Sequence, residues 1–434
     1  AMFVGLLLER GYRVLALTPD RKALESCLIQ RKLTDHPLLQ VLDWDAPRPR
    51  WRIRTRIARI WAWWLVFGER YTNKCPGSRV APGMHLLVRM KKYVFQFVVP
   101  PLFWVSRVLH SCSNGDASEL HGDASELHYL DPADIAHRIK AALKKSPWQP
   151  DCLFNMYLDM YKTGVEPWRQ FATICRLPWG GICFVPSDSP PQQGYYALPS
   201  LRGVCFLDET ICEKYSANIS NKYFQYLPDV TYTELPEGPF PLAEETLRRA
   251  AGRKTVFLGG SIGGQKNIAK WCELISLADP KSWFFVQVGE IHANTFSSED
   301  ALAFERLVAA PPENLFLYAQ YLSDERDFNA VIEVADILFA VYRNFRISSN
   351  MPGKAAHFEK PILVSDGFLM GERVCHYGIG FAVSQDDAHA MLAAMERLAV
   401  EPVPAENFAS FRTDFSERTA GDHLEHFLNH LLAR

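Results

Sequence analysis

The sequence predicts an α/β protein built from two Rossmann-like domains that face each other across a cleft. Two observations support this prediction. Short apolar strands alternate with helical segments in both halves of the chain, which is typical of parallel sheets covered by helices. Between the halves, residues 236–250 are rich in proline and acidic side chains, and this composition predicts a linker.

Length and composition agree with this class. The chain of 434 residues is too long for one ordinary core, and 48% of its residues are hydrophobic. We therefore expect a folded protein and exclude a disordered regulator. The ten cysteines form no CxxC pair, so neither a zinc ribbon nor a disulfide framework is indicated. A net charge of −2 argues against a nucleic-acid-binding protein.

The N-terminal domain is expected over residues 1–235, and it opens with a helix ending near Gly11 and a buried strand over 12–17. A helix that leads directly into a parallel strand normally follows an earlier strand and a glycine-rich turn. That earlier strand is missing here. We expect either a truncated start or a sheet without its usual first strand. Charged residues interrupt the apolar run, so we expect no secretory signal.

Residues 48–107 concentrate positive charge and aromatic side chains. They hold ten arginines, three lysines and eleven aromatic residues against one acid, Glu69. Arg52, Arg56 and Arg59 recur at helical spacing beside an apolar stripe, and a basic amphipathic helix rich in Trp is typical of a membrane surface. We expect a cytoplasmic protein attached peripherally to anionic membranes through this segment. The alternatives are a core helix with a solvated basic side and a basic groove for an acidic substrate.

The next segment contains a short exact repeat. The heptad GDASELH occurs twice in tandem, which predicts a surface loop over 113–129 and not a solenoid. Its histidines and acids leave metal binding as the alternative. Alternation of helix and strand then resumes, with a helix over 132–144 and strands over 152–156, 182–185 and 203–207.

A second α/β domain is expected over 251–405. Its first strand, Lys254 to Leu258, leads into a glycine-rich loop and a helix, and later strands follow over 283–288, 315–318, 337–340 and 361–364. The last segment, 406–434, contains a predicted helix over 422–432 that we expect to pack back on the N-terminal domain.

The loop after the first strand of this domain is a candidate phosphate site. Glycines between Gly259 and Gly264 let backbone N–H groups approach a phosphate, and Lys266 adds a full positive charge. The alternative is a glycine-rich turn that only permits tight packing.

A second candidate anion site lies within residues 342–360. Residues of N-cap type, Ser348 to Asn350, precede Pro352, as at the start of a capped helix. The cations beside this helix start are Arg343, Arg346 and Lys354. The alternative is an ordinary capped helix with solvated cations.

The order of motifs in the C-terminal half is strand–GGSIGGQK–helix, FFVQVGE, ENLFLYAQYLS, VADILFAVYRN and EKPILVSD. In this order they resemble the donor-binding domain of the GT-B fold glycosyltransferases that include glycogen synthase and the phosphatidylinositol mannosyltransferases. The N-terminal half agrees more loosely, through LPWGGICF, FLDE and YLPD. The resemblance covers nearly the whole chain, and the order of the motifs is its specific part.

The resemblance implies that the loop Gly260 to Lys266 holds the diphosphate of a nucleotide sugar. It also implies that Glu290 follows the next strand and that the turn after the third strand packs on the nucleobase. The donor-binding candidates are Gly260, Ser261, Gly263, Gly264, Lys266, Glu290, Gln320, Tyr321, Arg346, Ser349, Asn350 and Lys354. The donor is expected to be UDP- or GDP-linked, with no further cofactor and no required metal.

Three positions depart from the family's pattern. Ser261 stands where the family often has Arg, and Arg346 and Lys354 stand where the family has a pair of glutamates that grip sugar and ribose. Cations in place of these acids suggest that charge contributes more to holding the diphosphate here.

The expected reaction moves a hexose from a nucleotide sugar to a lipid-linked or polysaccharide acceptor at a membrane surface. An inverting reaction needs a general base from the N-terminal domain, and Asp20, Asp159 and Asp188 are candidates near strand ends. The alternatives are a GT-B-like binding subunit with altered catalysis and a sugar-nucleotide epimerase.

Overall fold

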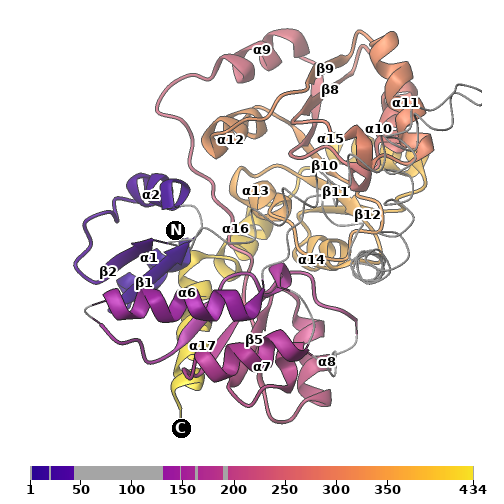
Figure 1. Ribbon diagram of the computed structural model, residues 1–434. Helices are drawn as coiled ribbons and strands as arrows, with labels where there is room; N and C mark the ends of the chain where they lie inside the picture. Colours follow the sequence, from indigo (N-terminus) through magenta and orange to yellow (C-terminus); the bar gives the residue numbers. More distant parts are fainter. Residues whose placement is uncertain are drawn as a thin grey trace, which may run out of the picture. The chain divides into compact units, whose positions relative to one another are not determined.

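The computed structural model describes residues 2–18, 21–43, 131–146, 148–161, 165–188 and 194–433 (Figure 1). The basic aromatic segment 48–107, the repeat 113–129 and Asp20 lie outside the described residues, so the predictions made for them stay predictions.

A parallel six-stranded sheet forms the core of the C-terminal half, in the order β12-β11-β10-β7-β8-β9. Its strands are β7 (Lys254–Gly259), β8 (Trp283–Val288), β9 (Leu315–Tyr318), β10 (Ile337–Ala340), β11 (Ile362–Ser365) and β12 (Gly380–Val383). The strands are mostly continuous apolar runs, since helices cover a doubly wound sheet on both faces. In sequence order this is the doubly wound 3-2-1-4-5-6 arrangement, which places a topological switch point between β7 and β10.

The helices of this half are α9 (Pro241–Ala250), α10 (Ile268–Leu277), α11 (Ser298–Ala309), α12 (Glu325–Glu333), α13 (Met351–His357), α14 (Leu369–Tyr377), α15 (Ala388–Val400) and α16 (Ala405–Asp414). The first of them changes the predicted linker, because residues 241–250 are helical and pack on α12 and β8. Pro241 starts this helix, since proline at the first helical position loses no hydrogen bond. The extended connection is the preceding stretch, residues 227–240.

Two separate parallel sheets form the N-terminal half. One pairs β1 (Val14–Thr18) with β2 (Leu39–Asp43), and the other has the order β3-β4-β5-β6. The second consists of β3 (Leu153–Asn155), β4 (Trp179–Cys183), β5 (Leu201–Phe206) and β6 (Tyr223–Tyr226). Among the described residues, no strand joins β1 to β3. Both sheets nevertheless contribute to one core, where Leu17 and Leu153 pack against the same buried cluster.

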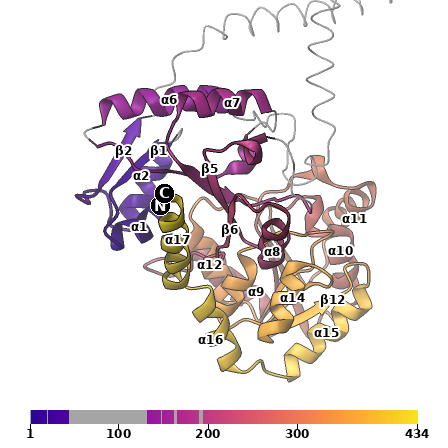
Figure 2. The same ribbon diagram turned by 90° about the horizontal axis from the view of Figure 1, so that it is seen from below.

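The helices of the N-terminal half are α1 (Met2–Glu9), α2 (Arg21–Gln30), α6 (Pro132–Lys145), α7 (Val165–Ile174), α8 (Glu209–Asn218) and the last helix, α17 (Glu417–Leu432). The helix α17 begins at the cap Ser416, earlier than residue 422, and contacts α1, β5 and β6 (Figure 2). Its Phe427 lies over β4 and β5, where a Cβ at Gly180 would come within 2.8 Å of the phenyl ring. The chain therefore crosses between its halves twice, at residues 227–240 and before α17.

The strand β4 begins three residues before its predicted start. Trp179, Gly180 and Gly181 belong to the strand and not to a turn before it. The glycines are needed there for close packing, since a Cβ at Gly181 would overlap the carbonyl oxygen of Asn155 in β3.

Candidate functional site

The predicted donor loop lies at the carboxyl ends of the strands, at the switch point of the six-stranded sheet. It follows β7, and the segment beginning at Tyr342 follows the neighbouring strand β10. Helices leave these two strands toward opposite faces of a doubly wound sheet, which opens a crevice where ligands bind in this class of fold. Lys266 and Tyr342 meet at this point.

Lys266 directs its charge into this crevice. Its Nζ donates a hydrogen bond to the Tyr342 hydroxyl at 2.8 Å and lies 3.9 Å from the centre of the same ring. Burial lowers the pKa of the Lys266 ammonium group to about 7. A lysine that is easily neutralised and faces the loop glycines is suited to accept a proton together with an anionic ligand.

The glycines of the loop allow a close backbone approach to the next strand connection. Gly260 has φ +96° and Gly289 has φ +142°, and a Cβ at Gly289 would overlap the Gly260 carbonyl oxygen. Backbone hydrogen bonds join the two segments, from Ile262 N to Glu290 O and from His292 N to Ile262 O, both 2.9 Å. The structure thus places Glu290 beside the loop, as the motif order requires.

The remaining loop glycines pack on the segment after β8. Gly264 N donates to Thr295 Oγ1 at 2.9 Å, and Thr295 Oγ1 lies close to Gly263 as well. Thr295 therefore fixes the loop from the side.

Tyr342 connects the loop to the start of α13. Its side chain is buried, and burial raises the pKa of its hydroxyl, opposed by a hydrogen bond with Ser349. Ser349 Oγ in turn accepts the Met351 N–H at 3.3 Å. The hydroxyls of Tyr342 and Ser349 thus form a polar path from Lys266 to α13, with Asn350 next to Ser349.

Arg343 anchors the segment that follows β10. Its guanidinium donates to the fully buried Asp300 carboxylate at 2.8 Å and to Asn267 Oδ1 at 3.1 Å. Its backbone N–H donates to Gln265 O at 2.8 Å. One residue therefore ties the segment after β10 to both the donor loop and α11.

Arg346 and Asp188, two candidates from different halves of the chain, pair with each other. Arg346 Nη1 lies 2.8 Å from Asp188 Oδ2, with side chains 68% and 71% exposed. Such an exposed ion pair stabilises the fold by about 1 kcal/mol or less, so either side chain can leave its partner and bind a ligand.

Lys354 makes its contacts away from the loop. Its fully buried side chain pairs with Glu325 at 2.6 Å and donates to Asn329 Oδ1 and to Tyr232 O, the last at 3.2 Å. Burial lowers its pKa, opposed by Glu325. Among the described contacts, none joins Lys354 to residues 260–266; instead it ties α13 to α12 and the first crossing.

Asp159 holds a backbone turn. Its carboxylate accepts the Phe184 N–H at 2.7 Å and the Val185 N–H at 2.9 Å, and Cys183 Sγ lies 3.2 Å away. These bonds occupy both carboxylate oxygens, which makes this residue an anchor of the connection after β4.

Gln320 and Tyr321 follow β9, two strands along from the donor loop. The Tyr318 hydroxyl donates to Gln320 Oε1 at 3.2 Å, and Tyr318 O accepts the Gly289 N–H at 3.0 Å. Tyr321 is 73% exposed, so its ring face is available for stacking. Ser261 is exposed at the rim of the loop.

The structure therefore joins Lys266 to Ser349 through Tyr342, and it bonds the backbone of Glu290 to the loop at Ile262. It does not bring Arg346 or Lys354 into contact with that lysine. Sequence reasoning placed Tyr342 and Arg343 in a candidate anion segment, but it missed their contacts with Lys266 and Asp300. The sequence signal for Tyr342 and Arg343 is their position directly after β10, the strand that neighbours β7 in a doubly wound sheet; Asp300 lies in α11 and has no such signal.

The part of the chain that the structure describes holds no group of three His, Cys, Asp or Glu side chains arranged for a metal ion. Within the same residues, none of the helices has the length and apolar character needed to cross a bilayer.

Comparisons with known proteins connect this geometry to a fold. Neither a known family nor a curated protein matches the sequence. Solved structures do match. A trehalose-6-phosphate structure from E. coli, bound with UDP-2-fluoro glucose, has a TM-score of 0.54 at 11% identity, over 70% of this chain and 78% of that one.

Two further structures are similar. Sucrose-phosphate synthase from Thermosynechococcus elongatus has a TM-score of 0.53 at 14% identity, over 71% of this chain and 79% of that one. The N-terminal domain of Candida albicans trehalose-6-phosphate phosphatase has a TM-score of 0.53 at 11% identity, over 96% and 89%. The predicted fold is confirmed: the chain has the GT-B fold of two Rossmann-like domains.

Proposed function

We propose that this protein is a nucleotide-sugar-dependent glycosyltransferase, specifically a hexosyltransferase. The observation that carries the proposal is the Lys266 ammonium group, which lies between the glycine loop and Tyr342 at the switch point of the sheet. Transfer of a sugar from a nucleotide diphosphate releases an anionic leaving group, so a fixed cation beside backbone N–H groups stabilises the transition state. A UDP-linked donor is favoured over a GDP-linked one, since the similar E. coli structure was bound with UDP-2-fluoro glucose.

Lys266 acts on the diphosphate, and Tyr342 orients it. Because burial favours the neutral amine, arrival of the diphosphate favours protonation and strengthens the ion pair where water is excluded. Arg346 is the second cation: it releases Asp188 and pairs with the diphosphate instead. For an inverting reaction, Asp188 is then released as a base candidate, with Asp20 as the other.

A titration with UDP-glucose tests the donor site. Lys266→Ala is expected to raise the dissociation constant by about 10- to 100-fold, the loss of one or two charged hydrogen bonds. The matched control is Lys281→Ala, an exposed lysine on the connection before β8. Equal UDP-glucose affinities of Lys266→Ala and the unchanged protein would contradict the assignment of Lys266 to the donor site.

The acceptor is proposed to be a lipid-linked or polysaccharide glycan, presented at an anionic membrane surface to residues 48–107. Each cation near such a surface contributes about 1 kcal/mol. Replacing Arg52, Arg56 and Arg59 together by Gln is expected to weaken binding to phosphatidylserine vesicles by about 100-fold in a sedimentation assay. Unchanged sedimentation would contradict peripheral attachment through this segment.

A binding subunit with altered catalysis is the second candidate. It is favoured by Lys354, a buried cation bonded to Glu325 and Asn329 at a position where the resemblance places a glutamate that grips sugar and ribose. Slow hydrolysis of UDP-glucose by the purified protein favours the enzyme. Tight donor binding without hydrolysis or transfer favours the binding subunit.

A further inference from the structure

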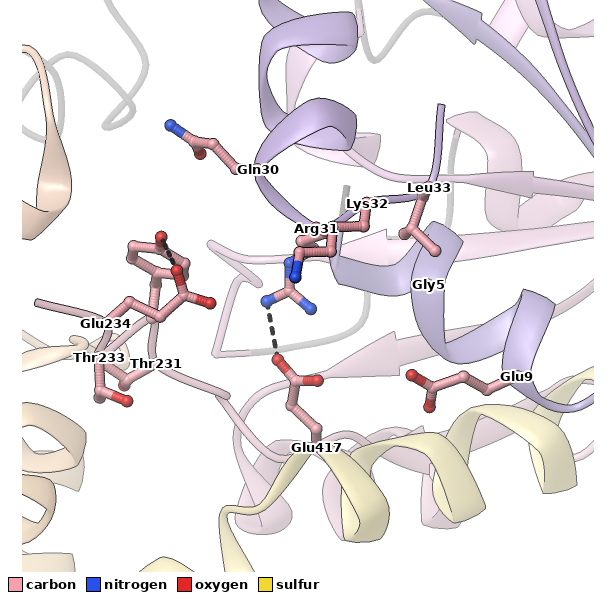
Figure 3. A pocket seen from close by; sticks show the side chains of 11 residues that line it. Gly5, Glu9, Gln30, Arg31, Lys32, Leu33, Thr231, Thr233, Glu234 and Glu417 are labelled. Atoms are coloured by element: carbon pink, nitrogen blue, oxygen red, sulfur yellow. Dashed lines mark hydrogen bonds and ion pairs between the residues drawn. The ribbon is translucent and has the colours of Figure 1, made fainter. Parts of the chain in front are cut away.

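A pocket of ≈ 410 Å³ lies beside the two crossings between the halves of the chain (Figure 3). Its walls come from α1, the end of α2 with the residues after it, the first crossing at Thr231 to Glu234, and Glu417 in the first turn of α17. Its size falls in the range of about 300–1,000 Å³ that is usual for small-molecule sites. None of its lining residues belongs to the donor loop.

Two fixed polar pairs face each other in this pocket. Arg31 Nη2 lies 2.7 Å from Glu417 Oε1, and the Tyr232 hydroxyl donates to Glu234 Oε2 at 2.7 Å. Figure 3 shows Arg31 pointing toward Glu417, with Thr231 and Glu234 of the first crossing at the left of the view. Glu417, Glu234 and Tyr232 raise the pKa of the Arg31 guanidinium against the opposing effect of burial. The walls therefore present preorganised donors and acceptors.

Further polar groups line the same space. Glu9, Gln30 and Lys32 are exposed there, and within the described part of the chain none has a side-chain hydrogen bond or ion pair. Lys32 has φ +56°, a conformation that costs a residue with a side chain about 1–2 kcal/mol. Strained backbone of this kind gathers at binding sites.

The charge balance indicates the class of ligand. Three carboxylates, of Glu9, Glu234 and Glu417, outnumber the two cations, Arg31 and Lys32. A phosphate would meet these carboxylates, and an apolar ligand would leave the polar walls unsatisfied. A neutral ligand with many hydroxyls, each both donor and acceptor, fits planar polar side chains and the hydroxyls of Thr231 and Thr233.

The pocket wall is bonded to the element that ends at the donor site. Thr231 Oγ1 donates to Asn350 O at 3.3 Å and packs against Gly353 of α13. Ser349, next to Asn350, hydrogen-bonds Tyr342, which holds Lys266. A ligand that orders Thr231 therefore acts on the same polar path as the donor.

We propose that this pocket binds a saccharide, and that saccharide binding raises the affinity of the donor site. The pocket is separate from the donor loop, and saccharide binding there is not part of the transfer reaction. Only the coupling between the pocket and the donor site rests on the proposed function. By linkage, the donor must raise the saccharide's affinity by the same factor, for which about 5- to 150-fold is the usual range.

Calorimetric titration of the full chain with maltose tests the pocket without any donor. Maltose is expected to bind with a dissociation constant of about 1 mM or lower. The double variant Glu9→Ala, Lys32→Gly is expected to weaken binding by about tenfold, since it removes two polar groups and keeps the left-handed backbone at 32. The matched control Glu313→Gln changes an exposed carboxylate before β9 and is expected to bind maltose unchanged.

The titration is repeated with UDP present. Maltose is then expected to bind more tightly, and Lys266→Ala is expected to lose UDP binding but keep maltose binding. Three results would overturn the saccharide site: no maltose binding, an equal loss of maltose affinity in Glu313→Gln, or competition of inorganic phosphate with maltose. Loss of maltose binding in Lys266→Ala would place the sugar at the donor loop and overturn it too. Failure of UDP to bind at all refutes the proposed function, while the maltose titration alone decides the pocket.

Discussion

Lys266 is the residue whose protonation couples ligand binding to pH. Burial lowers its pKa to about 7, so the free protein loses this charge as the pH rises through neutrality. A bound diphosphate favours the charged form, and binding above the pKa must take up a proton. UDP-glucose affinity is therefore expected to fall by about tenfold per pH unit above neutrality and to level off in weak acid. Titrations across this range measure it.

The control for this pH dependence is Lys266→Arg. A guanidinium stays charged throughout, so its UDP-glucose affinity is expected to be flat from weak acid to weak base. A similar slope in both proteins would assign the pH dependence to another group.

Gly289 is the residue on which the shape of the donor loop depends. A Cβ there would overlap the Gly260 carbonyl, and the backbone stands at φ +142°. Gly289→Ala is expected to cost about 3 kcal/mol or more of unfolding free energy in urea titrations. Gly252→Ala is the control, because φ is +86° but nothing lies within 4 Å of its added Cβ. It is expected to cost only about 1–2 kcal/mol.

At this scale the sequence could predict that Lys266 and its glycines form one loop after β7, since loop and strand are adjacent in the chain. It could not predict the partner Tyr342, 76 residues away, because the contact depends on β10 lying next to β7. The contacts of Lys354 were out of reach for the same reason. Its partners Asn329 and Tyr232 come from α12 and the first crossing, and nothing local distinguishes a buried lysine from a solvated one.

Among the elements, α17 follows the C-terminal half in sequence but packs on the N-terminal half. Its Phe427 is fully buried against β4 and β5, so Phe427→Ala is expected to cost about 3–5 kcal/mol of unfolding free energy. Leu432→Ala, at the exposed end of the same helix, is the control and is expected to change stability by about 0.5 kcal/mol. Equal effects in thermal unfolding would contradict the packing.

Element types were predictable where the strand is a nearly continuous apolar run, as in β7 and β8. Boundaries were missed where one residue type has two uses. Proline is typical of linkers, and the linker was predicted on that ground, yet Pro241 starts α9. Paired glycines read as a turn, yet Gly180 and Gly181 lie inside β4, because neighbouring backbone and Phe427 approach too closely for any side chain.

For the whole molecule, the pair Arg346–Asp188 reports on contact between the halves. Since both side chains are exposed, Asp188→Asn is expected to change stability by less than about 1 kcal/mol and to leave UDP-glucose affinity unchanged or higher. Arg346→Ala is expected to weaken that affinity. Weaker donor binding in Asp188→Asn would contradict exchange of Arg346 between Asp188 and the diphosphate.

The return of α17 to the N-terminal half also has a consequence for the order of folding during synthesis. The six-stranded sheet and its helices are complete once residue 414 has left the ribosome. The core over β4 and β5 stays uncovered until Phe427 and Leu428 are made, after the whole six-stranded sheet. Domains fold as units when their residues are available. The half with the six-stranded sheet is therefore expected to fold first, and the nascent N-terminal half is expected to depend on chaperones until α17 covers it.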